Sequence, residues 1–196
     1  MKALILCLIF IMQLSICKAI SPKEEAFRKT VSGVIKAFAD QDSLTLSKFM
    51  DKKTGICLLF RNGVFDNLMQ LNTIGFRDEQ FPQMMFSSAK GIRAPNLQYG
   101  KLPKYSCERE GWNKKGLWVD TMHTDHMVSA ICKMRNKLVP DHIAAKTISG
   151  YYTLEQKSRR VVLVGKNELE LVFYLSYMNG QWVLTIVDHV SSDCSA

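Results

Sequence analysis

The chain has 196 residues, of which 47% are hydrophobic and 22% are charged, and its formal net charge is +8. This length favours a single domain, and the composition excludes a disordered, collagen-like or coiled-coil chain. The basic residues are spread along the sequence without a basic stripe or a nucleic-acid-binding module, so we expect no nucleic-acid partner.

The first nineteen residues have the organisation of a secretory signal peptide. Met1 and Lys2 form a short positive start, an almost wholly apolar run follows over residues 3–16, and the small residue Ala19 ends the segment. The apolar run is shorter than the roughly 20 residues that a membrane span needs. We therefore expect cleavage after Ala19 and export to the periplasm or the exterior.

A lipoprotein anchor is the alternative to a cleaved leader. Residues 14–17, Leu-Ser-Ile-Cys, resemble a bacterial lipobox, in which Cys17 would receive the lipid. No later stretch of the sequence is long and apolar enough to form a transmembrane segment.

The mature chain, residues 20–196, is predicted to be one domain that begins with a helix. Ser21 can act as the N-cap, Pro22 suits the first helical position and Glu24 is placed for a capping box. Apolar residues at helical spacing extend this helix to about Asp40, and a short helix is expected from residue 43. A buried strand is expected over residues 55–60 and a short helix over 64–71. Residues 72–104 form an irregular middle segment.

The C-terminal half is predicted to hold strands at 105–109 and 117–120 and a helix at 125–138. Residues 160–165, 168–178 and 181–190 then predict an antiparallel meander with a turn at Asn179 and Gly180. In the expected register Tyr177 faces Trp182, Phe173 faces Ile186 and Leu171 faces Asp188.

Together these elements predict an α+β fold. N-terminal helices pack on a curved, cone-like antiparallel sheet, and the chain closes in a β-meander. The apolar face of the closing hairpin should lie beneath the first helix.

Four cysteines remain once the leader is removed, namely Cys57, Cys107, Cys132 and Cys194. In an exported chain this number predicts up to two disulfides, with three connectivities open, and free buried cysteines are the alternative. The sequence has no Cys-x-x-Cys, so it indicates neither a zinc knuckle nor a thioredoxin-type redox pair. A disulfide at Cys194 would tie down the C-terminus.

The sequence has no catalytic or cofactor-binding motif, and we expect no cofactor. His123 and His126, separated by Thr124 and Asp125, have the donor atoms to bind a metal and are weak metal candidates. Thr124 or Asp125 is also a natural N-cap for the helix that follows.

Asp188 is the catalytic candidate, because the expected register places it beside the apolar face, where a carboxylate can serve as a general base. It is also a candidate for ligand binding. Tyr177 and Trp182 are candidates on the same face, although aromatic residues in a sheet usually belong to the core. Trp112 lies in a polar turn and is the candidate for an exposed binding contact.

Residues 34–42 (VIKAFADQD), residues 46–49 (LSKF) and the ending over residues 173–188 carry a resemblance. They resemble the opening and the final hairpin of the nuclear-transport-factor-two-like superfamily, the cystatin-like cone that includes ketosteroid isomerase. The resemblance implies a long helix, a short helix and a strongly curved sheet that encloses an apolar pocket. That superfamily hosts isomerases, dehydratases and non-catalytic binders, so fold alone does not decide function. The exported start and residues 191–196 resemble secreted, uncharacterised proteins of gut-type bacteria.

Three functional hypotheses follow. The first is an exported, non-catalytic module that binds a small apolar ligand or a protein partner in a cone-shaped pocket. The second is a small isomerase, dehydratase or hydrolase that uses Asp188. The third is a structural or assembly protein that forms a homodimer through the sheet face carrying Val172, Tyr174, Val183 and Val187.

Overall fold

The computed structural model describes residues 20–76, 89–121, 126–138, 142–167 and 169–195. The expected signal peptide with Cys17, the metal candidate His123 and part of the irregular middle segment lie outside these residues. Within them the chain has the predicted α+β fold, in which helices precede a C-terminal meander of strands.

The N-terminal helices form where the sequence predicts them. Helix α2 covers Pro22–Asp40, and the side chain of its N-cap Ser21 accepts a hydrogen bond from the backbone N–H of Glu24. The short helix α3 covers Ser43–Ser47, and its N-cap Asp42 accepts from the backbone N–H of Thr45. These caps satisfy backbone donors that a helix start otherwise leaves open.

The strands form a seven-stranded mixed sheet in the order β2-β1-β9-β8-β7-β6-β3 and a separate two-stranded sheet. The large sheet consists of β1 (Ile56–Asn62), β2 (Phe65–Leu71), β3 (Leu97–Tyr99), β6 (Gly116–Val119), β7 (Ser158–Val164), β8 (Glu170–Met178) and β9 (Gln181–Asp188). The small sheet pairs β4 (Tyr105–Ser106) with β5 (Gly111–Trp112), and the 3-10 helix η4 (Cys107–Arg109) lies between them. The sheet is mixed rather than antiparallel, because β1 runs parallel to β9 and β3 parallel to β6.

Two predicted elements differ in the structure. Residues 64–71 were expected to form a short helix, yet β2 forms there and pairs with β1 along its whole length. Gly63 adopts a positive φ of 63° and reverses the chain, so that β1 offers β2 an antiparallel partner. Strand pairing therefore overrides a weak helical spacing. In addition, only Tyr105 and Ser106 of the strand expected at 105–109 are extended.

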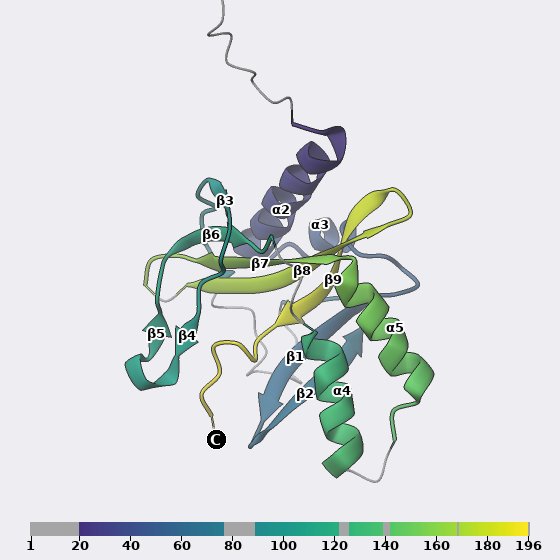
Figure 1. Ribbon diagram of the computed structural model, residues 1–196. Coiled ribbons are helices and arrows are strands. Elements are labelled where there is room, and N and C mark those ends of the chain that lie inside the picture. Colours follow the sequence, from purple (N-terminus) through teal and green to yellow (C-terminus); the bar gives the residue numbers. More distant parts are fainter. Residues whose placement is uncertain (1–19, 77–88, 122–125, 139–141, 168, 196) are drawn as a thin grey trace, which may run out of the picture.

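Helices lie on both faces of the sheet (Figure 1). Helix α2 covers one face, where Phe27, Val31 and Ile35 pack with sheet residues that include Phe173 and Leu175. Helix α4 (Met127–Leu138) and helix α5 (Ala145–Gln156) cover the other face, where the core includes Tyr174 and Ile186. Within the described residues no helix is long and apolar enough to cross a membrane.

The β8–β9 hairpin begins in the predicted register and then departs from it. Asn179 and Gly180 form the turn with φ values of 49° and 83°, and Tyr177 pairs with Trp182 as expected. Leu175 pairs with Leu184, but the next pair joins Tyr174 to Ile186. The intervening Thr185 is thus an extra residue in β9, which makes a β-bulge.

The bulge overturns the pairs expected beyond it. Phe173 pairs with Val187 rather than Ile186, so Val187 joins the core beneath α2. Ile186 moves to the core beneath α4 and α5. Asp188 follows Ile186 by two residues and therefore shares that face. The prediction that Asp188 lies beside the α2-covered face is wrong.

The sheet face proposed for dimer contacts is covered within the chain. Val172, Tyr174, Val183 and Val187 are at most 3% exposed. The bulge also separates them, because Val187 packs beneath α2 while Tyr174 packs beneath α4 and α5. The prediction of an exposed patch made of these four residues is wrong.

Phe173→Ala tests the core beneath α2. Phe173 is fully buried among the side chains of that helix, so its truncation should cost about 3–5 kcal/mol of unfolding free energy. The measurement is chemical denaturation of the oxidised protein. Lys29→Ala, at an exposed position of α2, is the control and should change the value by less than about 0.5 kcal/mol. Equal effects of the two changes would contradict this packing.

Candidate functional site

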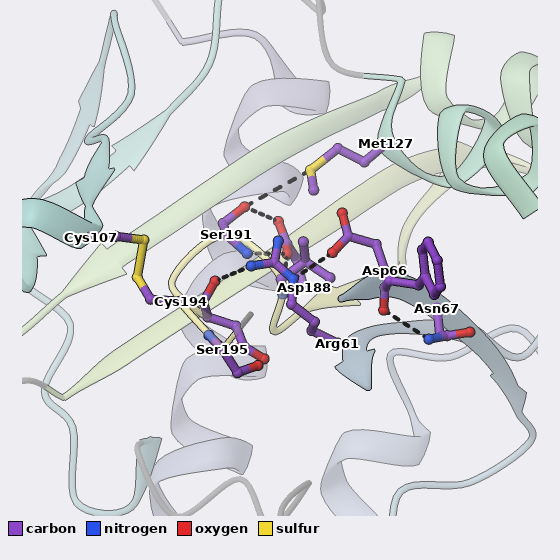
Figure 2. A network of polar contacts seen from close by, with 12 residues as sticks. Arg61, Asp66, Asn67, Cys107, Met127, Asp188, Ser191, Cys194 and Ser195 are labelled. Carbon is purple, nitrogen blue, oxygen red and sulfur yellow. Dashed lines mark hydrogen bonds and ion pairs between the residues drawn. A yellow bond between two sulfur atoms is a disulfide. The ribbon is translucent and has the colours of Figure 1, made fainter. Parts of the chain in front are cut away.

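Asp188 is held by several donors at the end of β9 (Figure 2). Its Oδ2 lies 2.9 Å from Nη2 of Arg160 and accepts a hydrogen bond of 2.7 Å from Oγ of Ser191. Its Oδ1 accepts from the backbone N–H groups of Val190 at 2.9 Å and Ser191 at 3.1 Å. The side chain of Asp188 is 0% exposed. Both oxygens of the catalytic candidate are thus engaged by the chain itself.

The C-terminal tail after Asp188 is fixed to several elements. Arg61 on β1 donates to the backbone oxygen of Asp193 at 2.6 Å and to the carboxylate of Asp66 at 2.8 Å. Ser192 donates to Glu170 on β8. A disulfide joins Cys107 in η4 to Cys194, as Figure 2 shows. The prediction that a cysteine near the end ties the tail down is therefore confirmed.

The other two cysteines of the described residues are free. Cys57 on β1 and Cys132 on α4 are both buried in the core beneath α4 and α5. Burial raises the pKa of the Cys57 thiol to about 12 and also raises the pKa of Cys132. Both groups are neutral thiols at physiological pH, and a thiol reacts only as its thiolate.

Glu155 on α5 caps the start of α4. It is 3% exposed and accepts hydrogen bonds from the backbone N–H of Val128 at 2.6 Å and from Oγ of Ser129 at 2.7 Å. Burial raises the pKa of Glu155, and these hydrogen bonds oppose that rise. Thr124 and Asp125, the N-cap candidates from the sequence, lie outside the described residues.

His126 lies beside this cap. Its Nδ1 is 3.9 Å from Oε2 of Glu155, and its ring centroid is 4.5 Å from that of Tyr152. Among the described residues no three metal-ligating side chains come together. Its expected metal partner His123 is not described, so a metal at this pair stays a prediction.

Trp112 lines a groove of about 350 Å³ between the small sheet and the β7–β8 connection. Its indole N–H donates to Glu170, and its ring makes an edge contact with Tyr105 at 5.5 Å between centroids. The groove is lined by Tyr105, Glu110, Gly111, Trp112, Lys115, Val164, Gly165, Glu170 and Ser192. Its lining includes two acidic residues, Glu110 and Glu170, and one lysine, Lys115.

Tyr177 lines a larger groove, of about 490 Å³, which we call the α5 groove. It lies between α5 and the β8–β9 turn, and Thr54 closes one side. The lining residues are Thr54, Thr147, Gly150, Tyr151, Thr153, Leu154, Lys157, Tyr177, Met178 and Asn179. The rings of Tyr177 and Trp182 contact each other in the core beneath α2, with centroids 5.2 Å apart, and Trp182 is 6% exposed.

The lining side chains of the α5 groove are mostly uncharged. Burial raises the pKa of Tyr151 to about 12, so this phenol keeps its proton at physiological pH. Its hydroxyl donates to Oε1 of Gln70 at 3.3 Å. Of the ten lining residues only Lys157 carries a charge, and none is an acid.

The structure thus brings together two of the four ligand-binding candidates. Tyr177 and Trp182 contact each other, and Tyr177 lines the α5 groove. Trp112 lines the smaller groove and Asp188 anchors the tail. Sequence analysis missed the contribution of α5. The helix buries one residue, Glu155, so its apolar spacing gives little signal.

Comparisons with known proteins find no family model, no curated protein and no solved structure that matches this chain. The resemblance to the nuclear-transport-factor-two-like superfamily therefore stays a prediction from the sequence.

Asp188→Asn tests the anchor of the tail. The change removes the carboxylate charge from a buried ion pair with Arg160, so we expect a loss of about 3–5 kcal/mol in unfolding free energy. Asp66→Asn, in the more exposed pair with Arg61, is the matched control and should cost at most about 1 kcal/mol. Urea denaturation of the oxidised proteins gives both values. A loss for Asp188→Asn no larger than for the control would contradict this role.

Proposed function

We propose that this chain is an exported, non-catalytic binding protein that holds a small, largely apolar molecule in the α5 groove. The observation that carries the proposal is the chemistry of the groove. Tyr151, Leu154 and Met178 supply apolar walls, and the threonine hydroxyls, Asn179 and Lys157 supply a few polar groups. Its volume of about 490 Å³ falls within the range of roughly 300–1,000 Å³ that is typical of small-molecule sites.

The placement of the buried acids supports a role without catalysis. A general base must lie within hydrogen-bond reach of the proton that it removes. The described residues include two buried carboxylates, Asp188 and Glu155, and each accepts hydrogen bonds from the fold. Neither lines the α5 groove. No contact of Asp188 favours the enzyme hypothesis.

Export is supported by the disulfide and by the predicted leader. The bond between Cys107 and Cys194 suits an oxidising compartment, since disulfides are rare in the reducing cytosol. The expected signal peptide would deliver the chain to such a compartment.

Mass spectrometry of the protein from its native host tests export. We expect a mature chain that starts at Ile20, because the signal peptidase would cut after Ala19. Retention of residues 1–19 would contradict the proposal. A lipid on Cys17 would establish the lipoprotein alternative instead of cleavage after Ala19.

Gly150→Leu tests the groove. Apart from its chain neighbours and the backbone of α5, no heavy atom lies within 4 Å of a Cβ placed on Gly150, so this lining position accepts a larger side chain without disturbing the fold. The uncharged dye Nile red should bind the native protein saturably with a rise in fluorescence. We expect Gly150→Leu to weaken this binding at least tenfold, which is roughly 1.4 kcal/mol.

Ser149→Leu is the control for that experiment. Ser149 is an exposed neighbour on α5 that does not line the groove, so this variant should bind Nile red as the native protein does. Equal binding by all three proteins would place the dye elsewhere. An absence of saturable binding to the native protein would overturn the proposed function.

A further inference from the structure

The disulfide between Cys107 and Cys194 lies at the surface of the protein, where η4 meets the C-terminal tail (Figure 2). Both cysteines are exposed. A thiolate from another molecule can therefore reach this bond without unfolding the chain. Exposed disulfides are reduced more readily than buried ones, and regulatory disulfides belong to this exposed class.

The other described cysteines cannot exchange with this bond from within the folded chain. Cys57 and Cys132 are buried in the core beneath α4 and α5, and burial raises the pKa of both thiols. Exchange requires a thiolate that approaches the disulfide. A reductant from outside the chain must therefore supply that thiolate, and the two buried thiols serve as internal markers of the folded core.

The tail up to Ser191 is held independently of the disulfide. Asp188 accepts hydrogen bonds from the backbone N–H groups of Val190 at 2.9 Å and Ser191 at 3.1 Å, and from Oγ of Ser191 at 2.7 Å. Val190 is 6% exposed and packs in the core beneath α4 and α5. Cleavage of the disulfide therefore leaves this part of the tail in place.

Beyond Ser191 the disulfide is the strongest attachment of the tail. The backbone oxygen of Asp193 accepts from Arg61 at 2.6 Å, and Ser192 donates to Oε1 of Glu170. Ser192 and Asp193 are partly exposed, so water competes for both hydrogen bonds and each contributes little compared with a covalent bond. Once the disulfide is broken, the residues from Ser192 onward can leave the surface.

The same part of the tail forms one side of the smaller groove. Ser192 lines that groove together with Glu170 and Trp112. Glu170 joins the other two, since its Oε1 accepts from Ser192 and its Oε2 accepts from the indole N–H of Trp112. Release of the tail would remove Ser192 from the groove and take away the donor that it supplies to Glu170.

We propose that the bond between Cys107 and Cys194 is a thiol–disulfide exchange site whose partner is a protein dithiol of the Cys-x-x-Cys type. One thiolate of the partner attacks a sulfur atom of the bond, forms a mixed disulfide and displaces the other cysteine as a thiolate. The second thiol of the partner then closes the partner's own disulfide and displaces the remaining cysteine. Two electrons pass to this chain, and the two protons of the dithiol end on Cys107 and Cys194. The reaction frees the tail after Ser191 and opens the smaller groove, independently of the α5 groove.

A dithiol suits this site better than a single thiol. The anchored Ser191 keeps Cys194 close to Cys107 after the first step, so the displaced cysteine can attack the mixed disulfide and restore the bond. A second thiol on the same partner competes with that reversal, because its effective concentration at the mixed disulfide is high. A separate monothiol lacks this advantage.

Alkylation of the native protein tests the exchange site. The oxidised protein is treated with reduced thioredoxin or with reduced glutathione, at equal thiol concentration and without denaturant, and the cysteines labelled by iodoacetamide are identified by mass spectrometry. We expect thioredoxin to open Cys107 and Cys194 to labelling at least tenfold faster than glutathione does. Cys57 and Cys132 should stay unlabelled until denaturant is added.

Two results of this experiment would contradict the proposal. Labelling of all four cysteines at one rate would show that reduction requires global unfolding, which would overturn the exchange site. Equal rates with thioredoxin and glutathione would overturn the dithiol partner.

Hydrogen exchange followed by NMR tests the release of the tail. After reduction the N–H groups of Asp193 and Ser195 should exchange at least tenfold faster, because the hydrogen bonds that they donate belong to the released part. The N–H groups of Val190 and Ser191 should keep their protection, since Asp188 still accepts from them. Unchanged exchange at Asp193 would show that the tail stays in place, contrary to the proposal.

The double variant Cys107→Ser with Cys194→Ser is the matched control. It lacks the disulfide, so its tail should exchange rapidly without any reductant, and added thioredoxin should change nothing. It keeps Cys57 and Cys132 as markers of the folded core. A response of the double variant to thioredoxin would assign the effect to another part of the protein and overturn the site.

Discussion

The extra residue Thr185 in β9 decides which side chains face each helical layer. Its hydroxyl lies 2.6 Å from that of Ser176, which lies 2.6 Å from that of Ser158. Ser158 in turn donates to the backbone oxygen of Leu154 at the end of α5. Buried hydroxyls need partners, and this row satisfies them across three strands. The bulge is thereby connected to the helix end that forms the α5 groove.

The same bulge determines on which face of the sheet Asp188 lies. It turns Asp188 to the face of α4 and α5, where Arg160 and Ser191 engage it. The α2-covered face is left with apolar side chains, which fill it as a core. The described grooves consequently lie outside that core, at the end of α5 and beside the small sheet.

Short sequence motifs were sufficient to predict the elements whose ends carry a cap or a turn residue. Ser21 and Pro22 mark the start of α2, and Asn179 and Gly180 mark the turn of the last hairpin. The bulge was not predicted, because the expected register assumed that side chains alternate between the two faces along all of β9. Nothing in the sequence of β9 marks Thr185 as the extra residue. Strand β2 depends on its pairing with β1, and the α5 groove joins segments distant in sequence. Neither arrangement is encoded in a short window of residues.

The position of β9 in the sheet has a consequence for the timing of folding. Strand β1 lies between β2 and β9, so it gains its second neighbour only from residues synthesised near the end of the chain. Such distant pairings slow folding, because the intervening chain must close as a loop. The bond between Cys107 and Cys194 likewise requires almost the whole sequence. The large sheet is therefore complete only once β9 has been synthesised and has paired with β1.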